Sequence, residues 1–574
     1  MKLSLYFISL LVCVLIPSIL HSQNLEQLGL KNGVKMGGSV NFSSVSYLAL
    51  GIPQRRDPFN WFLTGSLNLN LFGYSAPFSF SYSNVNSSYS QPFNQVSFAP
   101  QYKWVKTYIG FNSMTFSRYT LAGHVFFGGG IELTPGKWRV SAMYGRLKQA
   151  VPYSLTDTAQ NYRASYKRIG CGLKLGYEEN GNALHVTIFT AKDDPNSIPF
   201  TLPNPSLTPM QNIVIGAQGK KRFLKRFFVD VEYAVSVLNH DIRANSKGDS
   251  TGIKSSSNFI QRLLPENSTS RYYDAVNASL GYQANWYTIQ FKYERVAPEY
   301  QTLGAYFFNN DLQNFTVAPM LKMLKGKLNI AANIGLQNNN LDNSRASTTA
   351  RTVSASNINF VPNEKWSFTN SYSNFSSYTK VKRYNDPYFQ NKLDTLNFYQ
   401  ISKSLNSTIM RMLGAKINPQ SILLNISFQN ADDRASNTRT TQKSDFTSTN
   451  VSYSYGFTPS NLTMAISGNF YKTYASGIGT IFWGPSLTVT KSLFEKTLRM
   501  SMTTTYNQTE TSGVSKTASI LNGRINMNYS PKSKSSSGRQ SLSLAVNTTR
   551  KFNGASNQSA FTEITATLNY TRSF

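Results

Sequence analysis

The sequence predicts an all-β fold: a transmembrane, antiparallel, up-and-down β-barrel of about 26 strands (24–26), with no N-terminal plug domain. Three observations predict it. The last strand has one apolar and one polar face, similar alternating runs recur along the whole chain, and short and long connections follow one another regularly. Lipid-facing and lumen-facing residues alternate in a membrane barrel, because successive side chains of a strand point to opposite faces.

The last twelve residues show the alternation most clearly. The even positions are Ile564, Ala566, Leu568, Tyr570, Arg572 and Phe574, and the odd positions are Glu563, Thr565, Thr567, Asn569, Thr571 and Ser573. One set can contact lipid while the other lines a wet lumen. Tyr570 and the terminal Phe574 resemble the recognition signal that outer-membrane proteins present to their assembly machinery. A strand of a soluble secreted β-sandwich is the alternative, since its core face would also be apolar.

Comparable alternating runs continue through the chain, at 61–71, 229–237, 328–336, 422–428, 451–457, 462–470 and 521–529. They have about the 9–11 residues that a tilted membrane strand requires. Only residues 259–264 read as a short helix within a loop.

The connections indicate topology as well as strand number. Twelve are short and are expected on the periplasmic side with the carboxyl terminus: 74–77, 103–106, 135–138, 179–182, 221–226, 285–286, 324–327, 361–365, 418–420, 458–461, 492–497 and 531–539. Thirteen others are mostly longer: 50–60, 86–93, 117–121, 150–164, 195–211, 240–271, 298–313, 338–350, 377–395, 430–445, 474–480, 510–517 and 551–559. Twelve turns and thirteen loops join 26 strands.

The amino-terminal residues 1–22 read as a secretory signal, with Lys2, an apolar run over 3–20 and a small residue, Ser22, before the cleavage point. A retained anchor helix is the alternative. The remaining 23–574 are predicted to form one barrel domain, because about ten residues before the first strand leave no room for a plug. Cys13 lies in the signal, so the mature chain keeps only Cys171 and can form neither an internal disulfide nor a lipoprotein anchor.

Composition narrows the class of protein further. Aromatic residues make up 13% of the chain and charged residues 15%, and no stretch after the signal has the roughly 20 apolar residues of a membrane helix. This excludes a helical membrane protein and fits a barrel with aromatic girdles in the cell outer membrane of a Gram-negative organism. The net charge of +30 indicates outer-membrane lipid, lipopolysaccharide phosphates or an anionic cargo as counterparts, and no nucleic acid.

No catalytic, cofactor or metal motif emerges. His124, His185 and His240 have no ligand spacing, so neither a metal site nor an enzyme is predicted. The acidic pairs at 178–179, 193–194 and 432–433 read as solvated charge. The glycines at 128–130 lie inside a strand, where they permit a kink or close packing.

Basic residues concentrate in the short turns, most densely at Lys221, Arg222, Lys225 and Arg226. A ring of cations beside lipid phosphates is the simpler interpretation. The alternative is a docking rim for an acidic partner or cargo, with these four residues as its candidate partner-docking site.

Several segments resemble a block found in large outer-membrane barrels of the Bacteroidota, most of which are functionally uncharacterised. They are Tyr102-Lys-Trp-Val, Tyr119-Thr-Leu-Ala-Gly-His124, Leu133-Thr-Pro-Gly-Lys-Trp138, Met143-Tyr-Gly-Arg146, Tyr166-Lys-Arg-Ile-Gly170, Ala191-Lys-Asp-Asp194 and Tyr372-Ser-Asn-Phe375. The resemblance implies compartment and fold, and assigns no active residue and no substrate.

Barrels of 16–18 strands already leave an aqueous channel, so a 26-stranded ring needs something to fill it. The sequence predicts that long loops fold inward, 195–211 and 240–271 first, or that a separate plug protein or complex partner occupies the lumen. The preferred function is a channel or translocation pore for bulky solutes, glycans or polypeptides. A non-transporting component of an outer-membrane assembly or secretion complex is the alternative.

Overall fold

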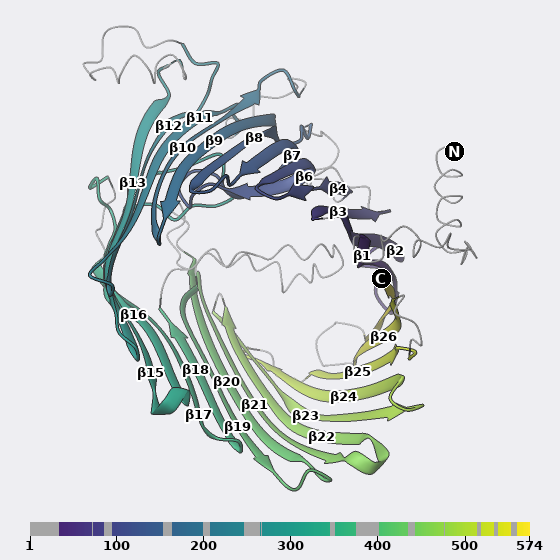
Figure 1. Cartoon of the computed structure of the whole chain (residues 1–574). Helices are drawn as coiled ribbons and strands as arrows, with labels where there is room; N and C mark the ends of the chain where they lie inside the picture. Colours follow the sequence, from purple (N-terminus) through teal and green to yellow (C-terminus); the bar gives the residue numbers. More distant parts are fainter. Residues whose placement is uncertain are drawn as a thin grey trace, which may run out of the picture.

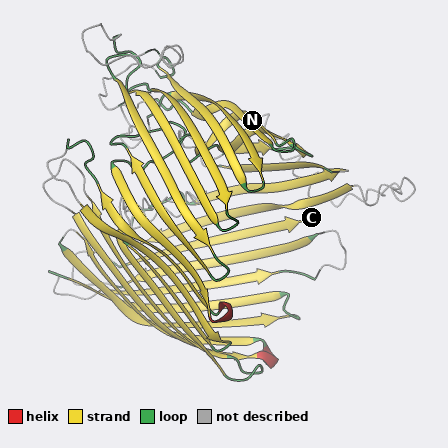
Figure 2. Cartoon of the chain, turned by 60° about the vertical axis from the view of Figure 1, so that its left-hand side comes forward, coloured by secondary structure: helices red, strands yellow, loops and turns green. Residues whose placement is uncertain are grey.

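The computed structural model shows a ring of antiparallel strands that follow one another in chain order (Figure 1). It describes residues 34–71, 73–84, 94–152, 164–198, 207–245, 265, 267–344, 350–374, 401–433, 442–475, 477–513, 518–532, 538–552 and 560–574. Almost all of them are strand, and two 3-10 turns, η3 (Leu324–Gly326) and η5 (Thr458–Ser460), are the helical elements within these ranges (Figure 2). No helix in the described part of the chain is long and apolar enough to cross a membrane.

The first half of the ring is built from β1 (Val34–Leu50), β2 (Phe59–Leu71), β3 (Tyr74–Ser83), β4 (Gln95–Phe98), β5 (Gln101–Tyr102), β6 (Val105–Thr115), β7 (Ala122–Leu133), β8 (Trp138–Lys148), β9 (Lys167–Glu179), β10 (Asn182–Asp194), β11 (Gln211–Phe223), β12 (Phe227–Asn239) and β13 (Ser270–Gln283). The second half comprises β14 (Tyr287–Val296), β15 (Leu312–Met323), β16 (Leu328–Asn338), β17 (Ala350–Asn363), β18 (Trp366–Ser373), β19 (Ile401–Leu413), β20 (Gln420–Asp433), β21 (Gln442–Phe457), β22 (Leu462–Ala475), β23 (Ile478–Leu493), β24 (Leu498–Thr511), β25 (Ala518–Tyr529), β26 (Arg539–Lys551) and β27 (Phe561–Ser573).

These 27 segments occupy 26 strand positions of the barrel, because β4 and β5 share one position between β3 and β6. Pro100 lies at the break between them, where a residue without an N–H cannot extend the ladder. The predicted barrel class and the number of 26 strands are therefore confirmed. In the described ranges, no separately folded plug accompanies the strands and their connections.

The ring closes where the last strand pairs with the first. β27 also pairs with β26, and its twelve-residue register with β1 runs from Ser39 opposite Ser573 to Leu50 opposite Thr562. Figure 1 accordingly places the carboxyl terminus beside β1. Phe574 follows β27 directly, and its backbone N–H donates to the Gly38 carbonyl over 3.0 Å. Closure leaves no free sheet edge, which a strand assembly in lipid requires.

The last strand presents one apolar and one polar face, as its sequence predicted. Leu568 and Tyr570 lie opposite Ser44 and Phe42 on the outer face, whereas Thr571 donates to the Asn41 side chain on the inner face over 2.9 Å. Large apolar residues that stay exposed recur around the outside of the ring, including Leu173, Leu184, Leu336, Ile466 and Met502. Lipid can cover such a band, which water would not stabilise.

The predicted connections agree with the structure apart from small shifts. The first turn lies before Tyr74 rather than over 74–77, and the connection predicted at 474–480 is tight, since β22 ends at Ala475 and β23 begins at Ile478. Asp432 and Asp433 belong to the end of β20 rather than to a loop. The predicted signal at 1–22 and the predicted helix at 259–264 lie outside the described residues.

The two faces of β27 give a direct test of the orientation. We expect Leu568→Arg to destabilise the folded barrel by about 2–4 kcal/mol, because it places a charge in the lipid-facing band. Thr567→Arg places the same charge one residue away on the inner face and should leave stability within about 0.5 kcal/mol of the parent. Urea unfolding in lipid vesicles, followed by heat-modifiable gel migration, measures both. Equal losses would contradict the assignment of the faces.

Candidate functional site: a lumen insert bound to one wall

Two connections fold against the inner wall of the ring, and we call them together the lumen insert. They are residues 116–121, between β6 and β7, and residues 297–311, between β14 and β15. Their apolar side chains join the main buried cluster of the protein, with Phe116, Tyr119, Leu121, Tyr300 and Leu303 all at most 2% exposed. These buried aromatic side chains exclude water, so the chain itself fills this part of the barrel interior.

Direct hydrogen bonds join the two halves of the insert. The Tyr300 hydroxyl donates to the Tyr119 carbonyl over 2.7 Å, and the Thr302 hydroxyl donates to the Thr120 carbonyl over 2.8 Å. The Ala122 N–H donates to the Gly304 carbonyl over 2.9 Å. Burial raises the pKa of Tyr300, so its hydroxyl remains a donor at every physiological pH. Each bond satisfies a buried backbone group that a loop folded into the interior would otherwise leave unpaired.

The insert is also bonded to the wall. The Leu303 N–H donates to the Asn212 side chain of β11 over 3.1 Å, and the Ser236 hydroxyl of β12 donates to the Gln301 carbonyl over 2.6 Å. The Lys174 ammonium of β9 donates to the Phe116 carbonyl over 2.7 Å. Three strands thus hold backbone groups of the insert, which makes it a fixed part of the wall in this structure.

Glycines on the inner face make room for this packing. A Cβ atom at Gly172 would lie 2.6 Å from the Phe116 ring, and one at Gly216 would lie 3.0 Å from the Thr120 methyl group. Within the insert, a Cβ at Gly304 would meet the Thr120 carbonyl at 2.7 Å and the Phe189 ring at 2.8 Å. At Gly130 it would meet the Met114 sulfur at 2.7 Å, which confirms the expected close packing in the 128–130 run. No larger residue fits these positions without displacing its neighbour.

Charged groups fix the inner edge of the insert. Glu294 of β14 accepts from the Tyr119 hydroxyl over 3.1 Å and from the Arg118 guanidinium over 2.9 Å. Its second oxygen accepts from the Asn314 amide over 3.2 Å. The Arg118 side chain is 54% exposed and stacks over the Tyr119 ring, so a cation marks the surface that the insert presents to the rest of the lumen.

One predicted acidic pair turns out to be part of the wall. Asp193 is 3% exposed and forms a bidentate pair with Arg168, at 2.7 and 2.9 Å, and it accepts the Met210 N–H over 2.9 Å. The interpretation of Asp193 as solvated charge is therefore wrong. Its buried carboxylate requires such partners, because removing one partner of a buried ion pair costs about 3–5 kcal/mol. In the acidic pair at 178–179, Glu179 forms an ion pair with Lys137. The Glu178 carboxylate lies 3.0 Å from the Arg139 guanidinium.

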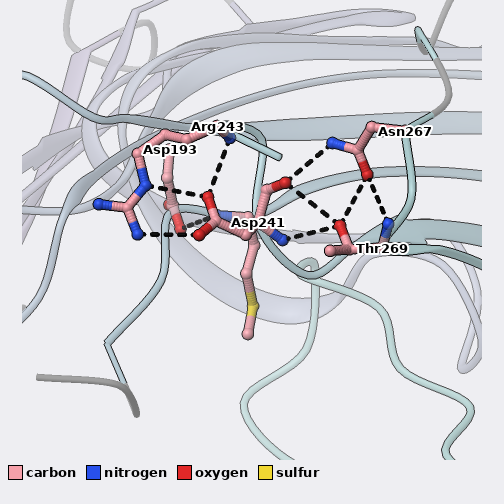
Figure 3. A network of polar contacts seen from close by, with 6 residues as sticks. Asp193, Asp241, Arg243, Asn267 and Thr269 are labelled. Carbon is pink, nitrogen blue, oxygen red and sulfur yellow. Dashed lines mark hydrogen bonds and ion pairs between the residues drawn. The ribbon is translucent and has the colours of Figure 1, made fainter. Parts of the chain in front are cut away.

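Polar contacts also hold the root of the longest connection, which joins β12 to β13 (Figure 3). Asp241 accepts from the Arg243 guanidinium at 3.0 and 2.8 Å, and its carbonyl accepts from the Asn267 amide over 2.8 Å. The Asp241 N–H donates to the Thr269 hydroxyl over 3.1 Å. We call residues 240–243 and 267–270 the loop root. The centres of the loops predicted to fold inward first, 199–206 and 246–264, lie outside the described residues.

The opposite wall has a different chemistry. Over β18–β23, Asp433 at the end of β20 is the one charged residue at a described inward position, and along these strands hydroxyl and amide groups hydrogen-bond to side chains of the neighbouring strand. Examples are Asn425 to Thr408 at 2.9 Å, Asn450 to Asn469 at 2.6 Å and Thr488 with Thr503 at 3.0 Å. The lumen therefore has one charged wall covered by the insert and one hydroxyl-rich wall, which is neutral except at the end of β20.

The histidines are not brought together. His124 stacks on Tyr306 with ring centroids 4.1 Å apart, His185 lies 3.2 Å from Glu178, and His240 faces the Tyr273 hydroxyl at 3.2 Å. Within the described ranges, no group of three or more His, Cys, Asp or Glu side chains is placed to hold a metal ion.

The four residues of the candidate docking cluster are brought together. Lys221 and Arg222 lie just before the last residue of β11, Lys225 and Arg226 lie in the turn to β12, and all four side chains are exposed. Tyr570 lies on the outer face, and Phe574 lies under the Arg572 guanidinium, 5.4 Å from its ring centre. Their role in assembly stays a prediction.

Sequence reasoning did not single out the insert. In sequence, 117–121 has the features of an ordinary short connection, and 298–313 those of one of several long ones. Two signals were available: large apolar residues in otherwise polar connections, at Tyr119, Leu121, Tyr300 and Leu303, and glycines at alternate inward positions of β9, at 170, 172 and 176.

No family model and no curated protein matches the chain. Among solved structures, it is similar to the P pilus usher (PapC) translocation pore, at 10% identity and a TM-score of 0.39 over 94% of this chain and 99% of that chain. It is also similar to the ferric citrate transporter FecA in its unliganded form, at 9% identity and a TM-score of 0.35 over 93% and 78%. For Pseudomonas aeruginosa OccK5 (OpdH) the values are 9% and 0.32 over 94% and 98%. Scores at this level carry no functional argument, and the fold stands on the strand pairing above.

The tight packing at Gly304 gives a test of the insert. We expect Gly304→Val to cost about 1–3 kcal/mol by overpacking, and to release the insert while the ring stays intact. Trypsin cleavage after Arg118 should then be faster, while heat-modifiable migration stays unchanged. Gly219→Val is the matched control, because a Cβ at Gly219 meets nothing within 4 Å. Slow cleavage in both variants would contradict the packing.

Acidification should loosen the loop root. Burial lowers the pKa of His240 below its usual 6.5, and the Arg271 charge adds to this while Glu299 opposes it. Its contribution to stability is thus complete above pH 6.5 and is lost as the pH falls from there through the lowered pKa. We expect faster amide exchange over 241–245 and 267–270 at pH 5 than at pH 7.5, after correction for intrinsic rates. The pH dependence should shrink in His240→Gln, and the same dependence in that variant would rule out His240 as its source.

Proposed function

We propose that this protein is a pore of the Gram-negative outer membrane that passes bulky polar solutes, glycans or polypeptides along its hydroxyl-rich wall. The observation that carries the proposal is a closed ring of 26 strands with an apolar outside and an inner face of laterally bonded hydroxyl and amide groups on one side. Taken as a circle with normal strand spacing and tilt, such a ring is about 50 Å across. A hydroxyl-rich surface suits polar cargo, since its groups can exchange bonds between neighbours and solute.

The lumen insert supports a selective pore rather than an open hole. It occupies the charged wall and is tied to β9, β11, β12 and β14, so it narrows the ring at a defined place. Among the described residues, the passage is bounded by the exposed edge of the insert, marked by Arg118, and by the hydroxyl-rich wall of β18–β23.

A non-transporting component of an outer-membrane complex is the second candidate. The observation that favours it is the exposed basic cluster at the β11–β12 turn, which fits a docking rim for an acidic partner. This candidate differs from the first in predicting no conductance.

Single-channel recording in planar bilayers tests the pore. We expect the parent to conduct ions, and the double variant Tyr119→Ala/Tyr300→Ala to conduct roughly twofold more, because it removes the aromatic core that holds the insert in the lumen. Phe307→Ala is the matched control, since Phe307 belongs to the insert but is 67% exposed, and its conductance should equal that of the parent. No conductance from the parent or from the double variant would reject the proposal.

A further inference from the structure

The short turn between β11 and β12 lies above a row of aromatic rings on the outer face of the barrel. Phe223, Phe227, Tyr282, Tyr287 and Trp286 follow one another with ring centroids 5.6, 4.9, 5.9 and 4.6 Å apart. The strand registers place Phe223 opposite Phe227, and Phe227 opposite Tyr282, on one face. We call these five residues the aromatic row.

The row faces lipid rather than the lumen. Lys221 lies opposite Val229 in the same alternation, and Val231, two residues on, is an exposed outward residue of β12. Trp286 is 55% exposed and Leu224, at the tip of the turn, is 78% exposed. Aromatic side chains in this position occupy the zone where acyl chains meet headgroups.

Cations lie directly beside the row. Lys221 shares its outer face, Lys225 sits at the tip, and the Arg226 guanidinium donates to the Tyr282 hydroxyl over 3.1 Å. In two other short turns the cation is neutralised, since Lys137 pairs with Glu179 and Lys532 pairs with Glu495. Among the described residues, no carboxylate pairs with Lys221, Arg222, Lys225 or Arg226. The cluster therefore presents uncompensated positive charge at the level of the headgroups.

We propose that Lys221, Lys225 and Arg226, together with the aromatic row, form a binding site for the headgroup of an anionic phospholipid. The cations bind the phosphate, while the rings and Leu224 contact the glycerol and upper acyl region. A lipid fits better than an acidic protein, because the site is continuous with the lipid-facing band and its aromatic part lies on the outer face. The inference is independent of whether the barrel conducts.

Energy transfer from tryptophan to labelled lipid tests the site. The parent protein, folded in phosphatidylcholine vesicles, is titrated with dansyl-labelled phosphatidylglycerol or dansyl-labelled phosphatidylcholine. We expect several-fold stronger transfer to the anionic probe, and loss of most of the difference in Trp286→Phe. Each cation removed should weaken the preference about fivefold at low salt, and added salt should reduce it.

Matched charge reversals locate the effect. Lys221→Glu/Lys225→Glu should abolish the preference, whereas Lys325→Glu/Lys327→Glu, the same charge change in the β15–β16 turn next to the row, should largely retain it. Lys221→Gln/Lys225→Gln serves if the reversal impairs folding, and heat-modifiable migration verifies the fold of each variant. Equal transfer to both probes, or equal loss in both reversals, overturns the proposal. An acidic protein that co-purifies stoichiometrically with the parent and is lost from the Lys221/Lys225 reversal, with lipid preference unchanged, would also overturn it in favour of protein docking.

Discussion

The pairing of β27 with β1 is the constraint on which the rest of the structure depends. Without it, two strand edges would expose unpaired N–H and C=O groups, which lipid cannot satisfy. Once the ring is closed, every strand has a fixed register, and the alternation along it assigns each side chain to lipid or lumen. Closure thus lets the apolar band face lipid and the polar face line the lumen all the way around the ring.

A ring of this size creates a problem that its own loops partly solve. The interior is too wide for strand side chains to fill, as they do in a barrel of about eight strands. Two connections far apart in sequence meet on the wall of β9–β14, where glycines leave space and polar residues bond their backbone. The buried Arg168–Asp193 pair stiffens the same side. Charged residues such as Lys174 and Glu294 bind the insert on this side, whereas hydroxyl and amide groups predominate along β18–β23.

Much of the fold was predictable because barrel strands carry local signals. The period of two in β27 and the connections counted backwards from Phe574 predict 26 strands. The barrel of the structure has 26 strand positions. Asp193 shows the limit of such signals. In sequence it is one of two acidic residues at a strand end, whereas in the structure its buried carboxylate accepts hydrogen bonds from Arg168 and from the Met210 N–H. A linear pattern reports exposure only where a loop does not fold back over the strand.

By itself, the sequence determined the barrel class, the strand number, the alternation of faces and the density of cations at 221–226, because each depends on neighbours within one strand or one turn. Only the tertiary structure decided which loops enter the lumen, since Tyr300 and Tyr119 are 181 residues apart in sequence and are joined by a hydrogen bond on the inner wall. It also decided that the cations lie beside a row of outward aromatic rings, because that row is assembled from four strands and a turn, and no local pattern specifies how these strands pair.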